Sequence, residues 1–481
     1  MPHFRKPRAG CRPCRRVSLW AQSLLPLPLL SQVPLQQSLI SFANQELEKL
    51  AVESFTVVMR FMGDQSKPRN KDELDLAYEL LRLCREQEGL KDEIYCQLIK
   101  QVTVNPNPES CARGWRLLSL LTGYFCPTAT LMPYVTKYLQ DAAQSQELAR
   151  ACQDHLQCTV KYGGRRRLLP VGEMKAFLKG QGVRPLVIYL PGGVTYETKI
   201  RTFSVVAEVR EELCGEMGVT DPQEVQEFTI CLIKSPGEPV RPLRAGTNVN
   251  SVTQEEGVTL HVRRLTWHMP LHFDNPTYIS IIYSQLLRSF LQGKLLFPHV
   301  TNMEAQLAPL VAMQLLSLGV QDPSSEQDLL RHVPQVLQTQ VSLAMFRPQV
   351  AQQLRKLHGL SPEQAKIHFI EAMKHMTLFG YNVYLILRLS ERSLPAPCLL
   401  GFNHHHLILM DPATQKPCHS IPLKEVQRLQ LLSALDSDGM PGLEVNYGSP
   451  ANPKTLWLEL PQAQQLRHVL AYLLEESSTQ P

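Results

Sequence analysis

A run of three histidines and a pair of cysteines carry the side chains best suited to bind a metal ion. His404, His405 and His406 are consecutive. Neighbouring side chains in a strand point to opposite faces, so at most His404 and His406 could share an ion. Cys11 and Cys14 form one CxxC pair with no second pair nearby, which leaves a zinc site without half its ligands. The sequence therefore favours a hairpin corner and two free thiols, and we expect neither a metal nor a cofactor.

Sequence motifs that hold nucleotides or catalyse reactions are missing. Gly293-Lys294 is followed by Leu295 and lacks the upstream glycine of a phosphate-binding G-x-x-x-x-G-K-[ST] loop, so no nucleotide-driven motor is expected. H-E-x-x-H, G-x-S-x-G and G-x-G-x-x-G do not occur. The segment 436–439 lacks the spacing of a calcium loop and is predicted to form a turn. These observations favour a binding function over an enzyme.

Positive charge is concentrated in two places. The formal net charge is +5, but residues 1–45 hold six basic residues and no acidic one, which leaves the remainder at −1. That balance gives no reason to expect a nucleic-acid partner. Within the remainder, one dense basic patch consists of Lys161, Arg165, Arg166, Arg167 and Lys175. The patch is predicted to be either a solvated loop or a contact for an acidic surface, such as a microtubule or an anionic lipid.

The elements that position these residues belong to several domains. A chain of 481 residues with 44% hydrophobic and 19% charged residues is expected to fold as about three packed domains. Residues 1–45 are predicted to be a disordered, Pro-rich, basic leader, because Pro26 and Pro28 interrupt the apolar stretch that a secretory signal would need. The twelve scattered cysteines and the lack of a usable N-glycosylation site favour a reducing, cytoplasmic location.

Residues 46–183 read as a helical domain. Apolar residues recur with the helical period from Leu74, and Asp72 is predicted to cap that helix. A second helix is expected over 90–101, and residues 105–108 are predicted to end it. Within it, Asp92, Glu93 and Cys96 are predicted to be ordinary residues of a solvated helix face and of the core. A third is expected to end before Cys126.

Three strings in this domain carry a family resemblance. MRFMGD (59–64), DEIYCQLIKQ (92–101) and RGWRLL (113–118) resemble the myosin-tail-homology domain that precedes a FERM domain in unconventional myosins. The sequence departs from that family before Phe55, where the Pro-rich leader stands in place of the expected first helical segment. The resemblance therefore implies a helical domain that is truncated at its N-terminus.

The rest of the chain is predicted to form a multidomain α+β structure with three lobes. A hairpin, a helix and two strands over 184–270 read as ubiquitin-like, and 271–379 read as a helical lobe. Over 380–481 the period changes to two and a final helix follows Pro461, as in a pleckstrin-like β-sandwich. This order resembles FERM, which implies an acyl-CoA-binding-protein-like fold for the middle lobe. The junction at 372–382 resembles myosin tails, most of all class XV.

The resemblance implies a peptide-binding site in the groove between one sheet edge and the last helix of the pleckstrin-like lobe. The edge is expected at 424–431, where Val426, Arg428 and Gln430 alternate along a strand. Leu466, Val469 and Leu473 lie opposite, although the same stripe suits a plain hydrophobic core.

The resemblance implies a non-catalytic adaptor that binds peptide tails of membrane or scaffold proteins and associates with the cytoskeleton in the cytoplasm. Two alternatives stay open. One is a peripheral adaptor that binds anionic lipid through the basic patch. The other is an inactive fragment without a motor.

Overall fold

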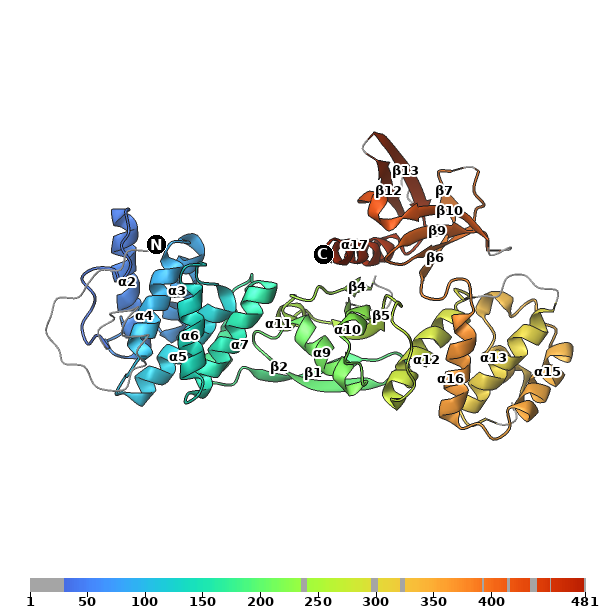
Figure 1. Ribbon diagram of the computed structural model, residues 1–481, viewed down its shortest axis with the longest axis horizontal. Helices are drawn as coiled ribbons and strands as arrows, with labels where there is room; N and C mark the ends of the chain where they lie inside the picture. The colour runs from blue at the N-terminus through green and yellow to red at the C-terminus, as the bar shows by residue number, and fades with distance from the viewer. Residues whose placement is uncertain are drawn as a thin grey trace. The chain divides into compact units, whose positions relative to one another are not determined.

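The computed structural model describes residues 30–234, 240–295, 302–320, 325–391, 393–412, 416–432, 439–449 and 451–479. Cys11, Cys14, most of the predicted leader and most of the predicted turn at 436–439 lie outside these ranges. The chain divides into two compact units. Figure 1 labels the helices and strands of both. The first unit runs to Arg184 and also includes Lys199–Val205 and Ala245–Ser251, and the second unit contains the remainder. No helix within the described residues is both long and apolar enough to span a membrane.

The first unit is a bundle of amphipathic helices around a common apolar core. Its helices are α2 (Gln45–Met62), α3 (Glu73–Glu86), α4 (Leu90–Val102), α5 (Pro108–Tyr124), α6 (Met132–Ala142), α7 (Glu147–Tyr162) and α8 (Val171–Leu178). Asp72 caps α3 in a reciprocal capping box with Asp75, which confirms the predicted helix start. Asn107 caps α5, so the segment predicted as a stop also begins the next helix.

Two predictions about the start of this unit are wrong. The segment before Phe55 is helical from Gln45, where Asn44 caps α2. Residues 30–44, predicted as part of a disordered leader, lie against α4: the backbone N–H groups of Leu39 and Ile40 donate to the two carboxylate oxygens of Glu93 at 2.8 and 2.7 Å. Glu93 is fully buried, so it is neither a solvated residue nor part of an apolar core.

The ubiquitin-like lobe holds one mixed sheet with the strand order β2-β1-β5-β3-β4. Its strands are β1 (Val183–Tyr189), β2 (Thr195–Arg201), β3 (Phe228–Ile233), β4 (Arg241–Pro242) and β5 (Thr259–Arg264). Helices α9 (Val206–Glu216), α10 (Pro222–Glu227) and α11 (Val249–Val252) lie between them in the chain. The alternating exposure of β1 and β2 matches the predicted hairpin.

Phe203, just after β2, belongs to the core of the helical bundle. Its ring makes edge-on contacts with Tyr124 and Phe177 at centroid distances of 5.6 and 5.7 Å, and lies 4.7 Å from the ring of His155. Gly123 makes room for it, because a Cβ atom there would come within 2.5 Å of the Phe203 ring. The core of the helical bundle is therefore completed by a residue from the segment directly after β2.

The middle lobe is helical, as predicted. It consists of α12 (Pro276–Leu291), α13 (Met303–Ser317), α14 (Glu326–Leu330), the 3-10 turn η1 (Gln335–Leu337), α15 (Leu343–Lys356) and α16 (Pro362–Lys374). The sequence Ser361-Pro362-Glu363 predicts a helix start, because proline is favoured in the first turn. The structure confirms this start: Ser361 and Gln364 form a capping box at α16, and Pro362 occupies its first turn. Edge-on contacts of the Phe369 ring with Tyr283 and Phe290 join α16 to α12.

The last lobe is a β-sandwich closed by a helix, which confirms the pleckstrin-like prediction. One sheet has the order β10-β9-β8-β6 and the other β11-β12-β13-β7. Its elements are β6 (Asn382–Ile386), β7 (Arg388–Leu389), β8 (Cys398–Phe402), β9 (His406–Met410), β10 (Pro417–Pro422), η2 (Leu423–Glu425), β11 (Val426–Leu432), β12 (Gly442–Ser449), β13 (Asn452–Glu459) and α17 (Ala463–Thr479). Together they enclose one apolar core.

Candidate functional site

The predicted groove strand, β11, lies at the edge of its sheet and pairs with β12 on one side. The register shifts between Val426, opposite Tyr447, and Arg428, opposite Asn446. This irregularity interrupts the expected alternation: Val426 is 9% exposed and packs in the sandwich core, while Arg428 and Gln430 are exposed. The prediction that all three side chains line one face of the strand is therefore wrong.

The three predicted groove residues of α17 lie in the core of the sandwich. Leu466, Val469 and Leu473 are 0%, 1% and 2% exposed, so in this structure their side chains close the sandwich, as the alternative interpretation held. Another face of α17 contacts the ubiquitin-like lobe. There the Thr229 hydroxyl donates to the Tyr472 hydroxyl at 3.2 Å, and Arg244 pairs with Glu475 at 2.6 Å.

A third stripe of α17 was missed by the sequence analysis. Arg467 is exposed and Ala471 and Leu474 are half-buried, at the i, i+4, i+7 spacing of one helix face. On the opposite flank, Gln465 donates to the Tyr384 hydroxyl of β6 at 3.3 Å. Helix α17 also packs against β11, and Leu474 packs against the core of the sandwich. The sequence does contain this stripe, at the spacing of one helix face. It was not recognised because the neighbouring leucines form a stronger apolar pattern that was assigned to the core.

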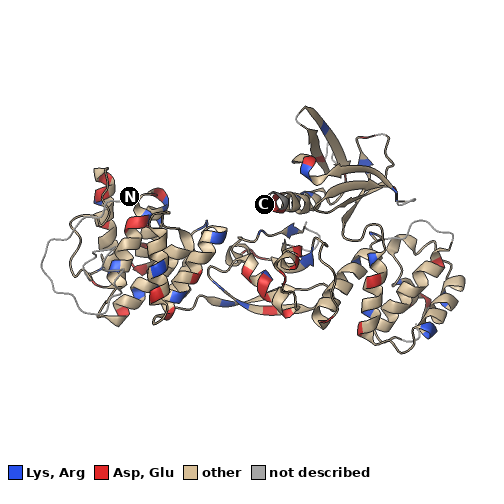
Figure 2. Cartoon of the chain, viewed as in Figure 1, with Lys and Arg blue, Asp and Glu red and all other residues tan. Residues whose placement is uncertain are grey.

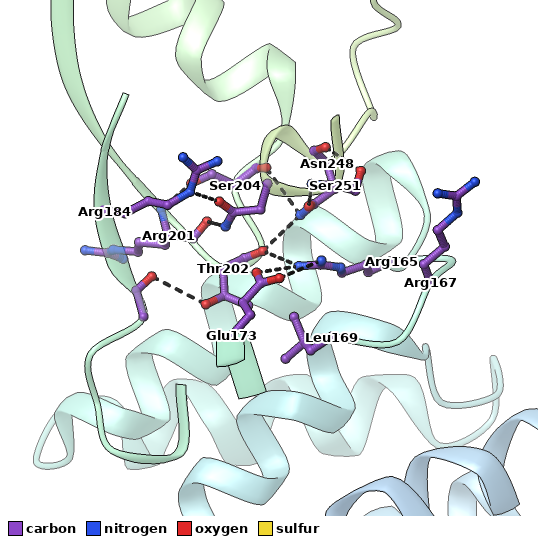
Figure 3. A network of polar contacts seen from close by, with 12 residues as sticks. Arg165, Arg167, Leu169, Glu173, Arg184, Arg201, Thr202, Ser204, Asn248 and Ser251 are labelled. Atoms are coloured by element: carbon purple, nitrogen blue, oxygen red, sulfur yellow. Dashed lines mark hydrogen bonds and ion pairs between the residues drawn. The ribbon is translucent and has the colours of Figure 1, made fainter. Parts of the chain in front are cut away.

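Arg165, predicted as part of the basic patch, is a structural residue. Its guanidinium makes two parallel contacts with the Glu173 carboxylate at 2.7 and 2.8 Å and donates to the carbonyl oxygen of Thr202 at 3.1 Å. Figure 3 shows Arg165 directed into this network and Arg167 directed away from it. The Arg165 side chain is only 3% exposed, so it is not available to a partner. The prediction that Arg165 belongs to an accessible basic patch is therefore wrong.

The remaining residues of the patch are exposed. These are Lys161, Arg166, Arg167 and Lys175. Arg85 from α3 joins them, because its guanidinium donates to the carbonyl oxygen of Arg166 at 2.7 Å. Figure 2 shows basic and acidic residues interspersed along the helices of this unit. The patch therefore stands out by its local density of positive charge rather than by the charge of the whole surface.

The histidine run does not follow strand geometry. His404 and His405 lie in the turn between β8 and β9, and only His406 is part of a strand. The rule of alternating faces therefore does not apply to His404 and His405. Their rings lie 3.4 Å apart between centroids, and the ring of His268 lies 3.3 Å from that of His404. Burial, together with the neighbouring histidines, lowers the pKa of His404 to about 4.

Comparisons with known proteins agree with this architecture. Residues 77–176 match the MyTH4 domain family, and residues 269–384 match the FERM central domain. The structure of the human myosin 7b C-terminal MyTH4-FERM domain in complex with the harmonin-a PDZ3 domain has the same fold. Its TM-score is 0.61 at 22% identity, covering 98% of this chain and 94% of that one. The chain thus belongs to the proteins that carry a MyTH4 domain followed by a FERM domain, as in unconventional myosin tails.

Within that class, the sequence is similar to two human myosins. It is 58% identical to unconventional myosin-XVB over 449 residues, which is 93% of this chain. It is 32% identical to unconventional myosin-XV over 489 residues, which is 98% of this chain. The chain spans 14% of the length of each of these relatives.

Proposed function

We propose that this chain is a cargo-binding module that takes up an extended peptide beside β11. MyTH4 and FERM domains are non-catalytic binding modules, which agrees with the lack of catalytic motifs in the sequence. We further propose that the module acts in the cytoplasm, in association with the cytoskeleton. The cargo class is the tails of membrane or scaffold proteins, and the PDZ3 complex of myosin 7b is one example of a scaffold partner in a related fold.

The position of β11 is the observation that carries this proposal. An edge strand offers backbone N–H and C=O groups to an added strand, and side-chain pockets beside it select the peptide. Exposed Arg428 and Gln430 supply polar contacts along the edge. We expect the Arg467 stripe of α17, the helix that packs against β11, to supply an apolar wall with a positive end. A peptide that combines an acidic residue with apolar neighbours fits this surface best.

The test is peptide binding measured by fluorescence anisotropy, with peptides selected from a library of acidic, apolar tails. We expect Arg428→Glu and Ala471→Trp each to weaken binding at least about tenfold, since one reverses a charge and the other fills the groove. Lys356→Glu, an exposed charge reversal on α15 in the helical lobe, serves as the matched control. Hydrogen exchange should show peptide-dependent protection at 426–432. Binding that is unaffected by both Arg428→Glu and Ala471→Trp would exclude this surface.

Val426→Glu is unsuitable as a test of the groove. Val426 packs in the sandwich core, so a carboxylate there would destabilise the lobe and abolish binding for the wrong reason. Arg428 avoids this problem because its side chain is exposed.

A second candidate function is binding to an acidic surface through the basic patch. The observation that favours it is the Arg85 contact, which holds a further exposed arginine beside Arg166 and Arg167. An anionic lipid surface or a microtubule would complement such a patch. The two functions do not exclude each other, because the patch and β11 belong to different units of the chain.

A further inference from the structure

Three imidazole rings from two distant segments of the second unit meet at one point. His268 follows β5 in the linker to α12, and His404 and His405 form the turn between β8 and β9. One nitrogen from each ring lies within 4.8 Å of the other two. This close packing of three basic rings needs an explanation. Three imidazoles are held together when their nitrogens bind one shared proton or metal ion, and without such a shared ion their contact adds little stability.

Hydrogen bonding within the described residues does not supply that explanation. The Nδ1 atom of His404 is buried and has no hydrogen-bond partner there. A buried polar atom without a partner is costly, and a bound ion or water is a usual reason for one in a native structure. The ring that carries this nitrogen lies beside the other two rings, whose planes are inclined to its own by 72° and 49°.

The backbone around each histidine is fixed by hydrogen bonds. Glu227 accepts the backbone N–H groups of His268 and Met269, the latter at 2.9 Å, and its other oxygen pairs with buried Arg264. In the turn, the side chain of Asn403 accepts the N–H groups of His405 and His406 at 2.8 and 3.0 Å. These hydrogen bonds fix the backbone that carries the three rings, which lowers the cost of ordering them around an ion.

The linker that carries His268 is itself docked on the pleckstrin-like lobe. Leu265 belongs to the apolar core of that lobe, and its carbonyl oxygen accepts a hydrogen bond from the Asn382 amide at 3.0 Å. The approach of His268 to His404 therefore does not depend on an isolated pair of surface side chains.

We propose that His268, His404 and His405 bind a divalent transition-metal ion, zinc in the first place, and that the ion fastens the linker to the β8–β9 turn. Three imidazole nitrogens are a common zinc ligand set, with water at the fourth position. At Zn–N distances of about 2.1 Å, tetrahedral geometry puts the nitrogens about 3.4 Å apart. The three nitrogens lie within 4.8 Å of one another, and the rings must move apart from their close contacts when the ion binds. Hard cations such as Mg²⁺ and Ca²⁺ prefer oxygen ligands and do not fit this set.

The test uses the full chain, purified free of metal and without a histidine tag. Titration with Zn²⁺ against a chromophoric chelator should give one tight equivalent, and Co²⁺ should give the intense visible absorption of a tetrahedral site. His268→Asn, His404→Asn and His405→Asn should each weaken binding by more than about 100-fold, since loss of a residue that only hydrogen-bonds to a metal ligand already costs about 10–100-fold. His406→Asn is the matched control and should bind like the unaltered chain.

A second measurement separates loss of the site from loss of the fold. Zn²⁺ should raise the melting temperature of the unaltered chain and of His406→Asn, and should not raise that of His268→Asn, while all three retain the same circular dichroism without metal. His268→Cys should restore binding, because a thiolate is also a zinc ligand. The proposal is overturned if the chain binds no Zn²⁺ at micromolar concentration, or if His406→Asn weakens binding as much as His404→Asn.

Discussion

At the residue scale, buried charge in the first unit performs structural work. Glu93 accepts two backbone N–H groups from the segment before α2, and Asp92 accepts the backbone N–H of Thr128 at 2.8 Å. The sequence placed both acids in the first turn of a helix, where a solvated position is the ordinary expectation. Their true roles depend on partners 36 to 54 residues away, which periodicity within one helix does not reveal.

The buried Arg165–Glu173 pair allows the contribution of a buried charge to stability to be measured directly. Glu173→Gln removes the negative charge and leaves the Arg165 guanidinium buried without a counter-ion. We expect the free energy of unfolding to fall by about 3 kcal/mol, because breaking one side of a buried pair costs far more than breaking an exposed one. Urea denaturation would measure this change. Asp141→Asn, which breaks the exposed Lys137–Asp141 pair, should cost less than about 0.5 kcal/mol. Equal losses would contradict the prediction.

His155 is expected to make stability depend on pH. Burial lowers the pKa of His155 to about 4, so the folded state binds a proton less readily than the unfolded state, whose pKa is near 6.5. Stability should therefore be fully present above pH 6.5 and decrease as pH falls toward 4, by up to about 3 kcal/mol. Unfolding free energies at pH 7 and 4.5 should show a smaller decrease for His155→Gln. An unchanged decrease in that variant would assign the effect to other groups.

At the element scale, sequence patterns predicted most helices and strands but not the local irregularities. The capping residues Asp72 and Ser361 were identified because capping depends on neighbours three residues away. Strand β10 was missed, since its sequence PCHSIP has prolines at both ends and little apolar alternation. The register shift in β11 was missed because it depends on pairing with β12, and that single shift moved Val426 from the expected groove into the core.

The fit between Phe203 and Gly123 can be tested by a double-mutant cycle. Phe203→Ala should lower the free energy of unfolding by about 3–5 kcal/mol through the cavity it leaves. Gly123→Ala should also destabilise, because its Cβ would come within 2.5 Å of the Phe203 ring. In the Phe203→Ala background the same change should be harmless, or stabilising by up to about 1 kcal/mol through helix propensity. Additive losses in thermal unfolding would show that the two sites are independent.

At the scale of the whole molecule, charge is local rather than global. The chain beyond residue 45 has a formal charge of −1, so electrostatic attraction to an acidic surface must come from particular residues. The order of the domains and the small net charge beyond residue 45 were predictable from the sequence. The first depends on the spacing of apolar residues along the chain, and the second depends on composition. The burial of Arg165 was not predictable, because a cluster of arginines in sequence does not tell which of them has a carboxylate partner.

The basic patch leads to a prediction about ionic strength. Arg166→Glu combined with Arg167→Glu should abolish co-sedimentation with phosphatidylserine vesicles, whereas Arg355→Glu with Lys356→Glu, an equal change of charge on α15, should not. Binding by the unaltered chain should decrease steeply between 50 and 300 mM salt, as screening shortens the range of attraction. Microtubules offered in a parallel experiment would identify the preferred surface. Equal behaviour of the two charge-reversed variants would reject the patch as a binding site.

The position of Phe203 also bears on how such chains evolve. Its ring comes from the sequence that follows the helical bundle, yet it is surrounded by Tyr124, His155 and Phe177 of that bundle. A recombination event that joined this bundle to a different neighbour would leave an unfilled cavity of aromatic size, and the departing strand would carry an unprotected ring. Selection should therefore keep the two segments together, so that they are duplicated, transferred and lost as a single heritable unit.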